Sequence, residues 1–200
     1  MRIAVIGAGS VGGGLGAALS RAGHSIVYGV RDPASEKVRA AVDSTAGSTA
    51  VLPREAVAGA DVVVFTLRPD AVRPTAAEMP PLDGVVLIDA MNRFGGDAAK
   101  STSDDLLELF PGARVVKAFN TIGFENLTTA RERTTPAAMF VAGDDAEAKG
   151  VAMRLATELG FRAEDAGPLS NAKPLEEMAK VWLALSKEHG RQVGFAISDG

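Results

Sequence analysis

The chain has 200 residues, of which 46% are hydrophobic and 23% are charged, as in an ordinary soluble globular protein with one α/β core. Its net charge of −4 argues against a general nucleic-acid binder, and the absence of cysteine excludes disulfides, thiolate catalysis and cysteine-ligated metals. The two histidines, His24 and His189, are too far apart in the sequence to suggest a metal site, so we predict none.

Short apolar runs of strand length alternate with stretches of helical periodicity along the chain. The predicted strands are 2–6, 25–29, 61–65, 85–89, 114–119 and 138–143, and the predicted helices are 11–23, 34–42, 53–60, 69–79, 103–110, 145–160 and 174–190. The strands are almost continuously apolar, which suits a parallel sheet covered on both faces. This order predicts a Rossmann-type, doubly wound, mainly parallel α/β fold, with residues 1–170 as the nucleotide-binding domain.

Several residues mark the expected ends of helices. Ser103 and Asp144 are predicted N-caps, and Gly160 and Gly190 are predicted helix stops. The apolar start of the chain after Arg2 could resemble a signal peptide, but its many glycines favour a strand, a turn and a helix. No run approaches the roughly 18 apolar residues of a membrane span, so we expect a cytoplasmic protein without membrane partners.

A glycine-rich motif follows the first predicted strand and opens the first helix. Its residues are Gly7, Ala8, Gly9, Ser10, Val11 and Gly12. The first glycine permits a tight turn, the second lets the backbone approach a pyrophosphate, and the third lets helix and strand pack closely. Because the amides at the start of the helix face the phosphates, the motif predicts dinucleotide binding; the alternative is a glycine-rich turn without a ligand.

Arg31 follows the second predicted strand, where an NAD-selective site usually has a carboxylate. A guanidinium there can pair with the 2′-phosphate of NADP, and Lys37 could add a second positive charge. The alternative is a solvated surface arginine. Asp32 precedes Pro33, which favours an N-cap over a ribose ligand. We therefore predict NADP(H) as the cofactor.

The sequence contains no evident catalytic proton donor. Tyr28 lies within a predicted strand, His24 lies before that strand, and the part of the chain after residue 170 has room for one helix and a tail. An acceptor that needs little proton chemistry fits best, because positioning of the two reactants can then account for catalysis.

The chain resembles the coenzyme F-420-dependent NADP oxidoreductase family, whose fold is shared by the reductase domain of the metalloreductases. The resemblance rests on residues 6–12, 29–33, 115–123, 140–149 and 165–171 and covers nearly the whole chain. It implies an NADP-binding Rossmann protein, commonly a homodimer, that transfers a hydride between NADP(H) and the deazaflavin coenzyme F-420. It also implies that residues 171–200, a C-terminal helix and tail, complete the acceptor pocket within the same compact unit.

The resemblance assigns roles by position. The residues that it places near the cofactor are Val30, Arg31, Thr66, Leu67, Arg68, Asn92 and Ile122, and those that it places near the second substrate are Asn120, Thr121 and Val193. Val30 replaces a serine and Asn120 replaces a histidine that family members carry. Asn120 and Ile122 are expected to position the reacting rings, and no residue is predicted to act as an acid or base.

Each assignment has a structural alternative. Thr66 and Leu67 could end a strand, Ile122 could belong to the core, and Asn120 could bond its own turn. Residues 165–171 could be a connector, and Trp182 is expected to be buried packing, at a subunit contact or within the chain, rather than a stacking platform. The alternative functions are reduction of another acceptor (a flavin, a quinone or a ferric chelate) and a non-catalytic NADP-sensing module.

Overall fold

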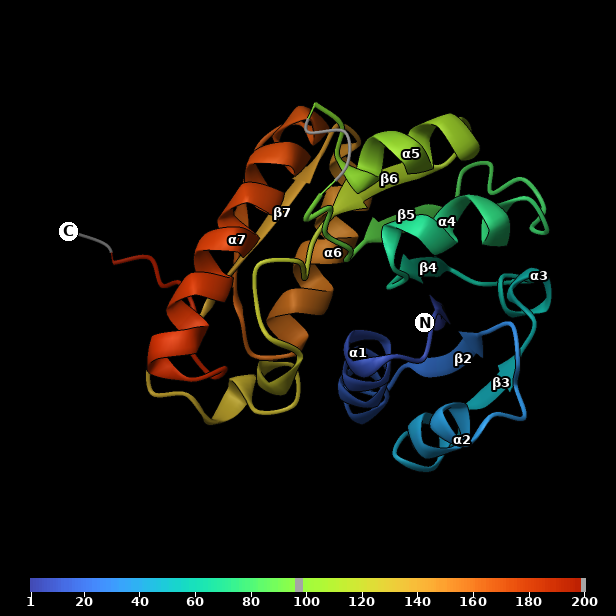
Figure 1. Ribbon diagram of the computed structural model, residues 1–200, viewed down its shortest axis with the longest axis horizontal. Coiled ribbons are helices and arrows are strands. Elements are labelled where there is room, and N and C mark those ends of the chain that lie inside the picture. The colour runs from blue at the N-terminus through green and yellow to red at the C-terminus, as the bar shows by residue number, and fades with distance from the viewer. Residues whose placement is uncertain (96–98, 199–200) are drawn as a thin grey trace.

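The computed structural model describes residues 1–95 and 99–198, and within them eight strands form one sheet in the order β3-β2-β1-β4-β5-β6-β7-β8 (Figure 1). The strands are β1 (Arg2–Ile6), β2 (Ser25–Gly29), β3 (Thr49–Val51), β4 (Val62–Phe65), β5 (Val86–Asp89), β6 (Arg114–Lys117), β7 (Ala138–Gly143) and β8 (Arg162–Asp165). Neighbouring strands are parallel except for β6 and β7. The predicted Rossmann-type fold is confirmed.

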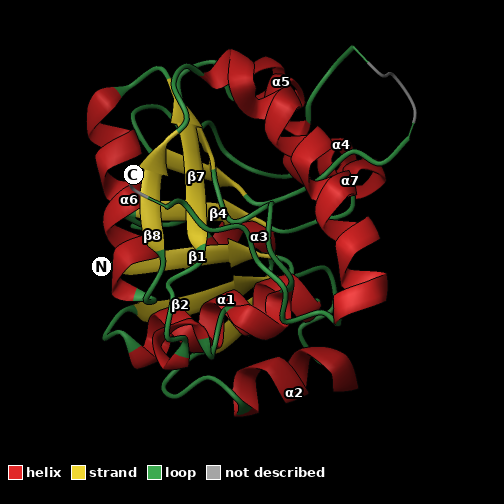
Figure 2. Ribbon diagram, turned by 90° about the vertical axis from the view of Figure 1, so that its left-hand side faces the viewer, coloured by secondary structure: helices red, strands yellow, loops and turns green. Residues whose placement is uncertain are grey.

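Helices cover both faces of the sheet (Figure 2). They are α1 (Ser10–Arg21), α2 (Glu36–Asp43), α3 (Pro53–Ala56), α4 (Pro69–Ala76), α5 (Thr102–Leu109), α6 (Ala146–Glu158) and α7 (Ala172–His189), with 3-10 turns η1 (Phe124–Asn126), η2 (Ala130–Glu132) and η3 (Leu169–Asn171). One core cluster joins a sheet face to α1, α2 and α6, and a second joins the opposite face to α3, α4 and α5. This two-sided burial explains the continuous apolarity of the central strands.

The sequence pattern missed the two edge strands. β3 has only three residues, and β8 reads Arg-Ala-Glu-Asp, which has no apolar run. An edge strand is paired on one side only and tolerates charged side chains, so apolarity does not identify it.

Two predicted helix caps were wrong by one or two residues. Asp145, not Asp144, caps α6 by accepting from the amide of Ala148, and Asp144 instead accepts from the amide of Leu169. Ser101, not Ser103, caps α5. The predicted stops are confirmed, because Gly160 and Gly190 follow α6 and α7 with φ of 97° and 82°.

The parallel strands β1 and β4 are neighbours in the sheet, and the strands that follow each of them in the chain lie on opposite sides of this pair. The connections that leave these two strands therefore diverge, and a crevice opens at their carboxyl ends. In open α/β sheets ligands bind at such a switch point. None of the helices within the described ranges is long and apolar enough to cross a membrane.

Candidate functional site

A tight turn joins β1 to α1 at the switch point. Gly7 has φ of 107°, and a Cβ on Gly12 would lie 2.1 Å from the carbonyl oxygen of Gly7. By contrast, a Cβ on Gly9 would meet nothing within 4 Å, so the backbone there is open to a ligand. The first amides of α1 have no partners within the helix, and the turn therefore provides the geometry expected for a pyrophosphate.

A cavity of about 560 Å³ lies beside this turn. The predicted cofactor residues in its wall are Gly7, Ala8, Gly9, Arg31, Lys37, Thr66, Leu67 and Arg68. They come from the ends of β1, β2 and β4 and from the start of α2, which the topology brings together at one edge of the sheet. Thr66 also has the structural role of a strand end, since its hydroxyl lies 3.0 Å from the carbonyl of Ile6 and 3.1 Å from that of Gly7.

One side of the cavity is cationic. Arg31 and Lys37 are exposed and border it, and within the described ranges Arg31 forms no ion pair. Ser35, which the sequence analysis did not assign, lies between them as the N-cap of α2, and its hydroxyl makes no capping hydrogen bond. Arg68 is also in the wall, but it pairs with Asp70 at 2.5 Å and holds the pKa of that carboxyl below its usual value.

Asp32 is neither the cap of α2 nor part of the cavity wall. Its carboxylate accepts from the amide of Ala34 at 3.1 Å, so it forms a turn with its own backbone. The prediction of Asp32 as N-cap was therefore wrong, because the helix begins at Glu36, four residues later. Val30 is buried in the core, and its amide bonds the carbonyl of Val51.

A second, smaller cavity of about 140 Å³ lies beyond the first turn of α1. Its wall consists of Val11, Asn92, Phe94, Asn120, Ile122, Gly123, Phe124, Ala179, Trp182, Leu183 and Arg191. Residues 7–9 border the larger cavity and Val11 borders the smaller one, so the turn separates the two. This arrangement can accommodate a dinucleotide whose two halves lie on either side of the turn.

The side-chain amides of Asn92 and Asn120 connect the segments that form one wall of the smaller cavity. The side-chain nitrogen of Asn92 donates to the backbone carbonyl of Asn120, and the side-chain nitrogen of Asn120 donates to the side chain of Asn92 and to the carbonyl of Leu175. Asn120 thus bonds across to another loop and to α7, not to its own turn. Just before it, Phe119 has φ of 61°, an uncommon conformation for a bulky residue, which turns the chain out of β6.

Three further predicted residues, Ile122, Thr121 and Val193, differ in their position relative to the two cavities. Ile122 is 9% exposed, so it is both core and cavity wall. Thr121 is buried and does not border either cavity, while the carbonyl of Val193 accepts from the indole nitrogen of Trp182 at 2.8 Å. Trp182 is buried, as expected, and also forms cavity wall.

The smaller cavity is apolar apart from its amides and one cation. The Arg191 guanidinium lies 5.0 Å from the ring centre of Trp182 and 5.6 Å from that of Phe124, and it also pairs with Glu125. The residues of this wall include no carboxylate, histidine, lysine or tyrosine. Tyr28 is buried in β2, where desolvation raises its pKa and keeps the phenol neutral.

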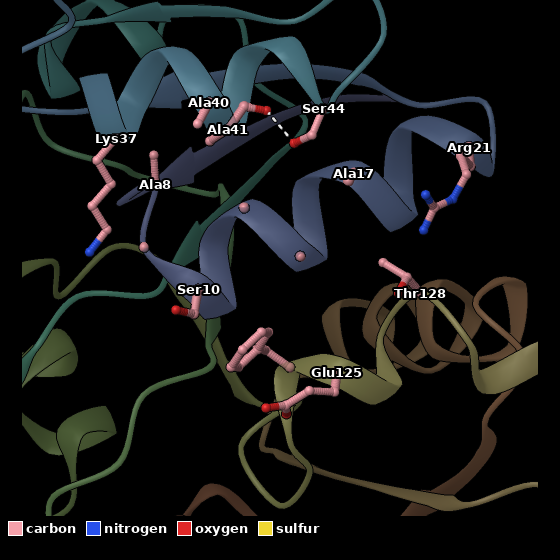
Figure 3. A pocket seen from close by; sticks show the side chains of 14 residues that line it. Ala8, Ser10, Ala17, Arg21, Lys37, Ala40, Ala41, Ser44, Glu125 and Thr128 are labelled. Carbon is pink, nitrogen blue, oxygen red and sulfur yellow. Dashed lines mark hydrogen bonds between the residues drawn. The ribbon is translucent and has the colours of Figure 1, made fainter. Parts of the chain in front are cut away.

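A shallow hollow of about 470 Å³ runs between α1, α2 and η1 (Figure 3). Lys37 and Arg21 stand at its opposite ends, and between them the helices present small side chains such as Ala17 and Ala40. The hydroxyl of Ser44 is already bonded to the carbonyl of Ala41. Its walls contain none of the residues at the ends of β2 and β4, which meet at the switch point, so the two cavities beside the turn are the stronger candidate site.

A buried ionic cluster that the sequence did not predict lies close to the smaller cavity. Asp89, Lys117 and Glu176 have no exposed surface, and the lysine Nζ lies 3.0 Å from Asp89 and 2.8 Å from Glu176. Each of these residues lies within an element predicted from its apolar neighbours, so no spacing linked them. The described residues contain no group of three or more acidic or histidine side chains that could hold a metal ion.

Comparisons with known proteins show which proteins this chain is similar to. Residues 2–93 match the family described as NADP oxidoreductase, coenzyme F-420-dependent. The metalloreductase STEAP3 of Rattus norvegicus is 28% identical over 178 residues, which cover 88% of this chain and 36% of that protein. The chain thus spans about a third of the length of the curated relatives that it matches.

Solved structures resemble the whole chain. A protein from Arthrobacter sp. FB24, provisionally assigned as an F-420-dependent NADP reductase, is 26% identical with a TM-score of 0.86, and each chain covers 100% of the other. An imine reductase from Pseudomonas sp. shares the fold at 14% identity and a TM-score of 0.73, over 93% of this chain and 62% of that one. The resemblance predicted from the sequence is confirmed.

Proposed function

We propose that this chain, whose residues 2–93 match the coenzyme F-420-dependent NADP oxidoreductase family, transfers a hydride between NADP(H) and the deazaflavin coenzyme F-420. The match to an NADP-dependent oxidoreductase family and to a solved structure of that description supports the nicotinamide cofactor. The choice of F-420 as the second substrate is our proposal. It is supported by the family description and by a mainly apolar cavity whose wall includes no carboxylate, histidine, lysine or tyrosine.

The residues present fit an NADP molecule. The open space over Gly9 would accept the pyrophosphate. The exposed cations Arg31 and Lys37, with the hydroxyl of Ser35, which makes no capping hydrogen bond, would hold the 2′-phosphate. Ser35, the N-cap of α2, would thereby replace the hydroxyl of the serine that family members carry at position 30. Bound NADPH supplies the hydride.

The smaller cavity would orient the nicotinamide end. Its volume of about 140 Å³ is below the roughly 300 Å³ at which pockets for drug-sized ligands begin, so it accommodates one ring. The second ring would stack at the mouth, where Phe94 is 54% exposed. Ile122 and the Asn92–Asn120 pair would fix the first ring, and rate enhancement would come from holding the reacting carbons about 3–3.5 Å apart.

One observation favours a second candidate function. The metalloreductases match 88% of the chain, and their name describes reduction of a metal. Such a protein would use the same NADPH site and pass electrons to a flavin or a ferric chelate. The matched residues make up 36% of that relative, so the reduction of a metal by this shorter chain is a proposal of its own.

The deciding experiment is a stopped-flow assay of NADPH oxidation with coenzyme F-420, FMN and a ferric chelate as separate acceptors. We expect fast single-turnover oxidation with F-420. Turnover with FMN or ferric chelate alone would favour the second candidate, and tight NADPH binding without turnover by any acceptor would indicate a sensor. We also propose that the protein acts as a cytoplasmic homodimer, which sedimentation velocity would test.

A further inference from the structure

We propose that Asp89, Lys117 and Glu176, hereafter the buried triad, form the positioning element that sets the geometry of the acceptor pocket. The inference rests on the proposed function, since it concerns how the second substrate is held. The triad joins β5, β6 and α7, three elements far apart in sequence whose chain segments surround the smaller cavity.

The triad is tightly built. Asp89 and Lys117 are direct partners across the parallel strands β5 and β6, so their side chains leave the sheet on the same face. From there Lys117 Nζ reaches Glu176 on α7 at 2.8 Å, the carbonyl of Met91 at 2.8 Å and the hydroxyl of Thr102 at 2.8 Å. One ammonium group therefore connects two strands, the start of α5 and α7.

The triad carries more negative than positive charge, and other groups compensate for the excess. Asp89 accepts from the amide of Met91 at 2.9 Å and the hydroxyl of Ser103 at 2.7 Å. Glu176 Oε1 accepts from the amide of Thr102 at 2.8 Å, whereas its Oε2 has no hydrogen-bond partner among the described residues. The start of α5 thus helps to stabilise two carboxylates that no water reaches.

Such a cluster is a poor way to gain stability. The desolvation of buried ions offsets most of their attraction, and well-packed apolar side chains of similar volume are often as stabilising or more so. A buried ionic group does, however, favour one arrangement of its partners, because any displacement leaves a charge unpaired in a dry environment. We therefore infer that the main effect of the triad is to fix β5, β6 and α7 in one arrangement.

The triad acts on the cavity wall through α7. Ala179 and Leu183 lie three and seven positions after Glu176, on the same face of the helix, and both line the smaller cavity together with Trp182. A second contact reinforces the first, since Asn120 donates to the carbonyl of Leu175, one residue before Glu176. Lys117 itself lies three residues before Asn120.

The cavity is thus bounded by two segments that the triad fixes to each other. One is the chain that leaves β6 through Asn120 and Ile122, and the other is α7. None of the three triad side chains borders the cavity, so they act through these segments and do not touch the substrate. Release of α7 should widen the pocket and leave the phosphate side, on β1, β2 and β4, unchanged.

The test is Glu176→Gln, with Glu177→Gln as the matched control. The first substitution leaves one ammonium beside one carboxylate, so the buried charge is balanced and the protein should fold. The second changes the adjacent residue, which pairs with Lys173 and Lys180 at the surface. Three properties are measured for both variants and the wild type: kcat/KM with F-420 and with FMN, the dissociation constant of NADPH, and hydrogen exchange of the amides of α7 and α1.

For Glu176→Gln we expect kcat/KM for the acceptor to fall roughly tenfold or more, because small misplacements of reacting rings are costly. The NADPH dissociation constant should stay within about twofold, and amides of α7 should exchange faster while those of α1 do not. Glu177→Gln should match the wild type in all three. Unchanged acceptor kinetics, or an equal loss of NADPH affinity, would overturn the proposal.

Failure of the proposed function would give a different result. If the wild type oxidises NADPH with neither acceptor, the enzymatic assignment fails, and the positioning role is judged by α7 exchange and by quenching of FMN fluorescence on binding. Faster α7 exchange with weaker FMN binding in Glu176→Gln would then support the role, whereas wild-type values for either would refute it.

Discussion

Asn92 and Asn120 bind each other through two hydrogen bonds of 2.9 and 3.0 Å, one from each side-chain nitrogen. The pair links the loop after β5 to the loop after β6, directly below the smaller cavity. Each amide is oriented by its partner, so the site has a preformed floor before any ligand binds. Preformed geometry of this kind reduces the entropy that a bimolecular reaction must lose.

Ile122 is expected to matter more for catalysis than Asn120. In Ile122→Ala the loss of a buried side chain beside the nicotinamide lets the near-attack geometry relax, and we expect a loss of up to about a hundredfold in the rate of hydride transfer. Asn120→Ala should reduce the rate less, because Asn92 and α7 keep other contacts. Stopped-flow oxidation of bound NADPH measures both rates.

The control for this pair is Val181→Ala, which shortens an exposed side chain on α7 and should leave the rate unchanged. NADPH affinity should change little in all three variants, because the phosphate contacts lie at the other cavity. A wild-type rate in Ile122→Ala would mean that this residue serves the core alone.

Arg31 is expected to determine the preference for NADPH over NADH. Arg31→Ala removes a charge-assisted contact with the 2′-phosphate, which costs about 1.5–3 kcal/mol, or roughly ten- to a hundredfold in the dissociation constant for NADPH. The constant for NADH should barely change. Isothermal titration calorimetry with both nucleotides measures the difference, and Arg39→Ala, an exposed arginine on α2 outside the cavity wall, is the control. Equal weakening of both nucleotides would contradict the assignment.

Ser35 is expected to contribute less than Arg31 but in the same direction. Its hydroxyl is neutral and makes no capping bond, so Ser35→Ala should weaken NADPH binding by about 1 kcal/mol, roughly fivefold, without affecting NADH. Ser25→Ala, at the opposite end of β2, controls for general effects of the substitution. If the affinity for NADPH is unaffected, the 2′-phosphate lies nearer to Lys37 or Arg68.

Gly12→Val should abolish binding of both nucleotides. The first atom of the new side chain would lie 2.1 Å from the carbonyl of Gly7, a backbone atom that cannot yield without moving the turn. Circular dichroism should still show a folded protein. Gly13→Ala is the matched control, because its Cβ would lie 3.6 Å from Ala41, an ordinary contact, and should preserve binding. Retained NADPH affinity in Gly12→Val would place the nucleotide elsewhere.

The sequence predicted the parts of this site that depend on local backbone geometry. The Gly7–Gly12 turn and the position of Arg31 follow from the order of strand, turn and helix, and the structure places both at the switch point. The contribution of Ser35 was not visible because it depends on which residue caps α2, and the sequence favoured Asp32 as that cap. Cap positions are set by competing local hydrogen bonds, which the sequence does not rank.

The buried triad could not be predicted for a different reason. A lysine within an apolar strand and a glutamate within an amphipathic helix each look ordinary alone. Only the packing of α7 against the ends of β5 and β6 shows that Lys117 and Glu176 share one dry environment. Long-range ion pairs of this kind have no sequence spacing by which they could be recognised.

The charged edge strand β8 limits how copies of this chain can associate. Edge strands expose backbone donors and acceptors that can pair with another sheet, and charged side chains oppose such pairing. Arg162 and Glu164 pair with each other along β8, and the tail crosses nearby, with Arg162 bonding the carbonyl of Ile197 and β7 bonding that of Phe195. This edge is therefore a poor template for strand addition, and the proposed homodimer should not form by pairing of β8 with the sheet of a second subunit.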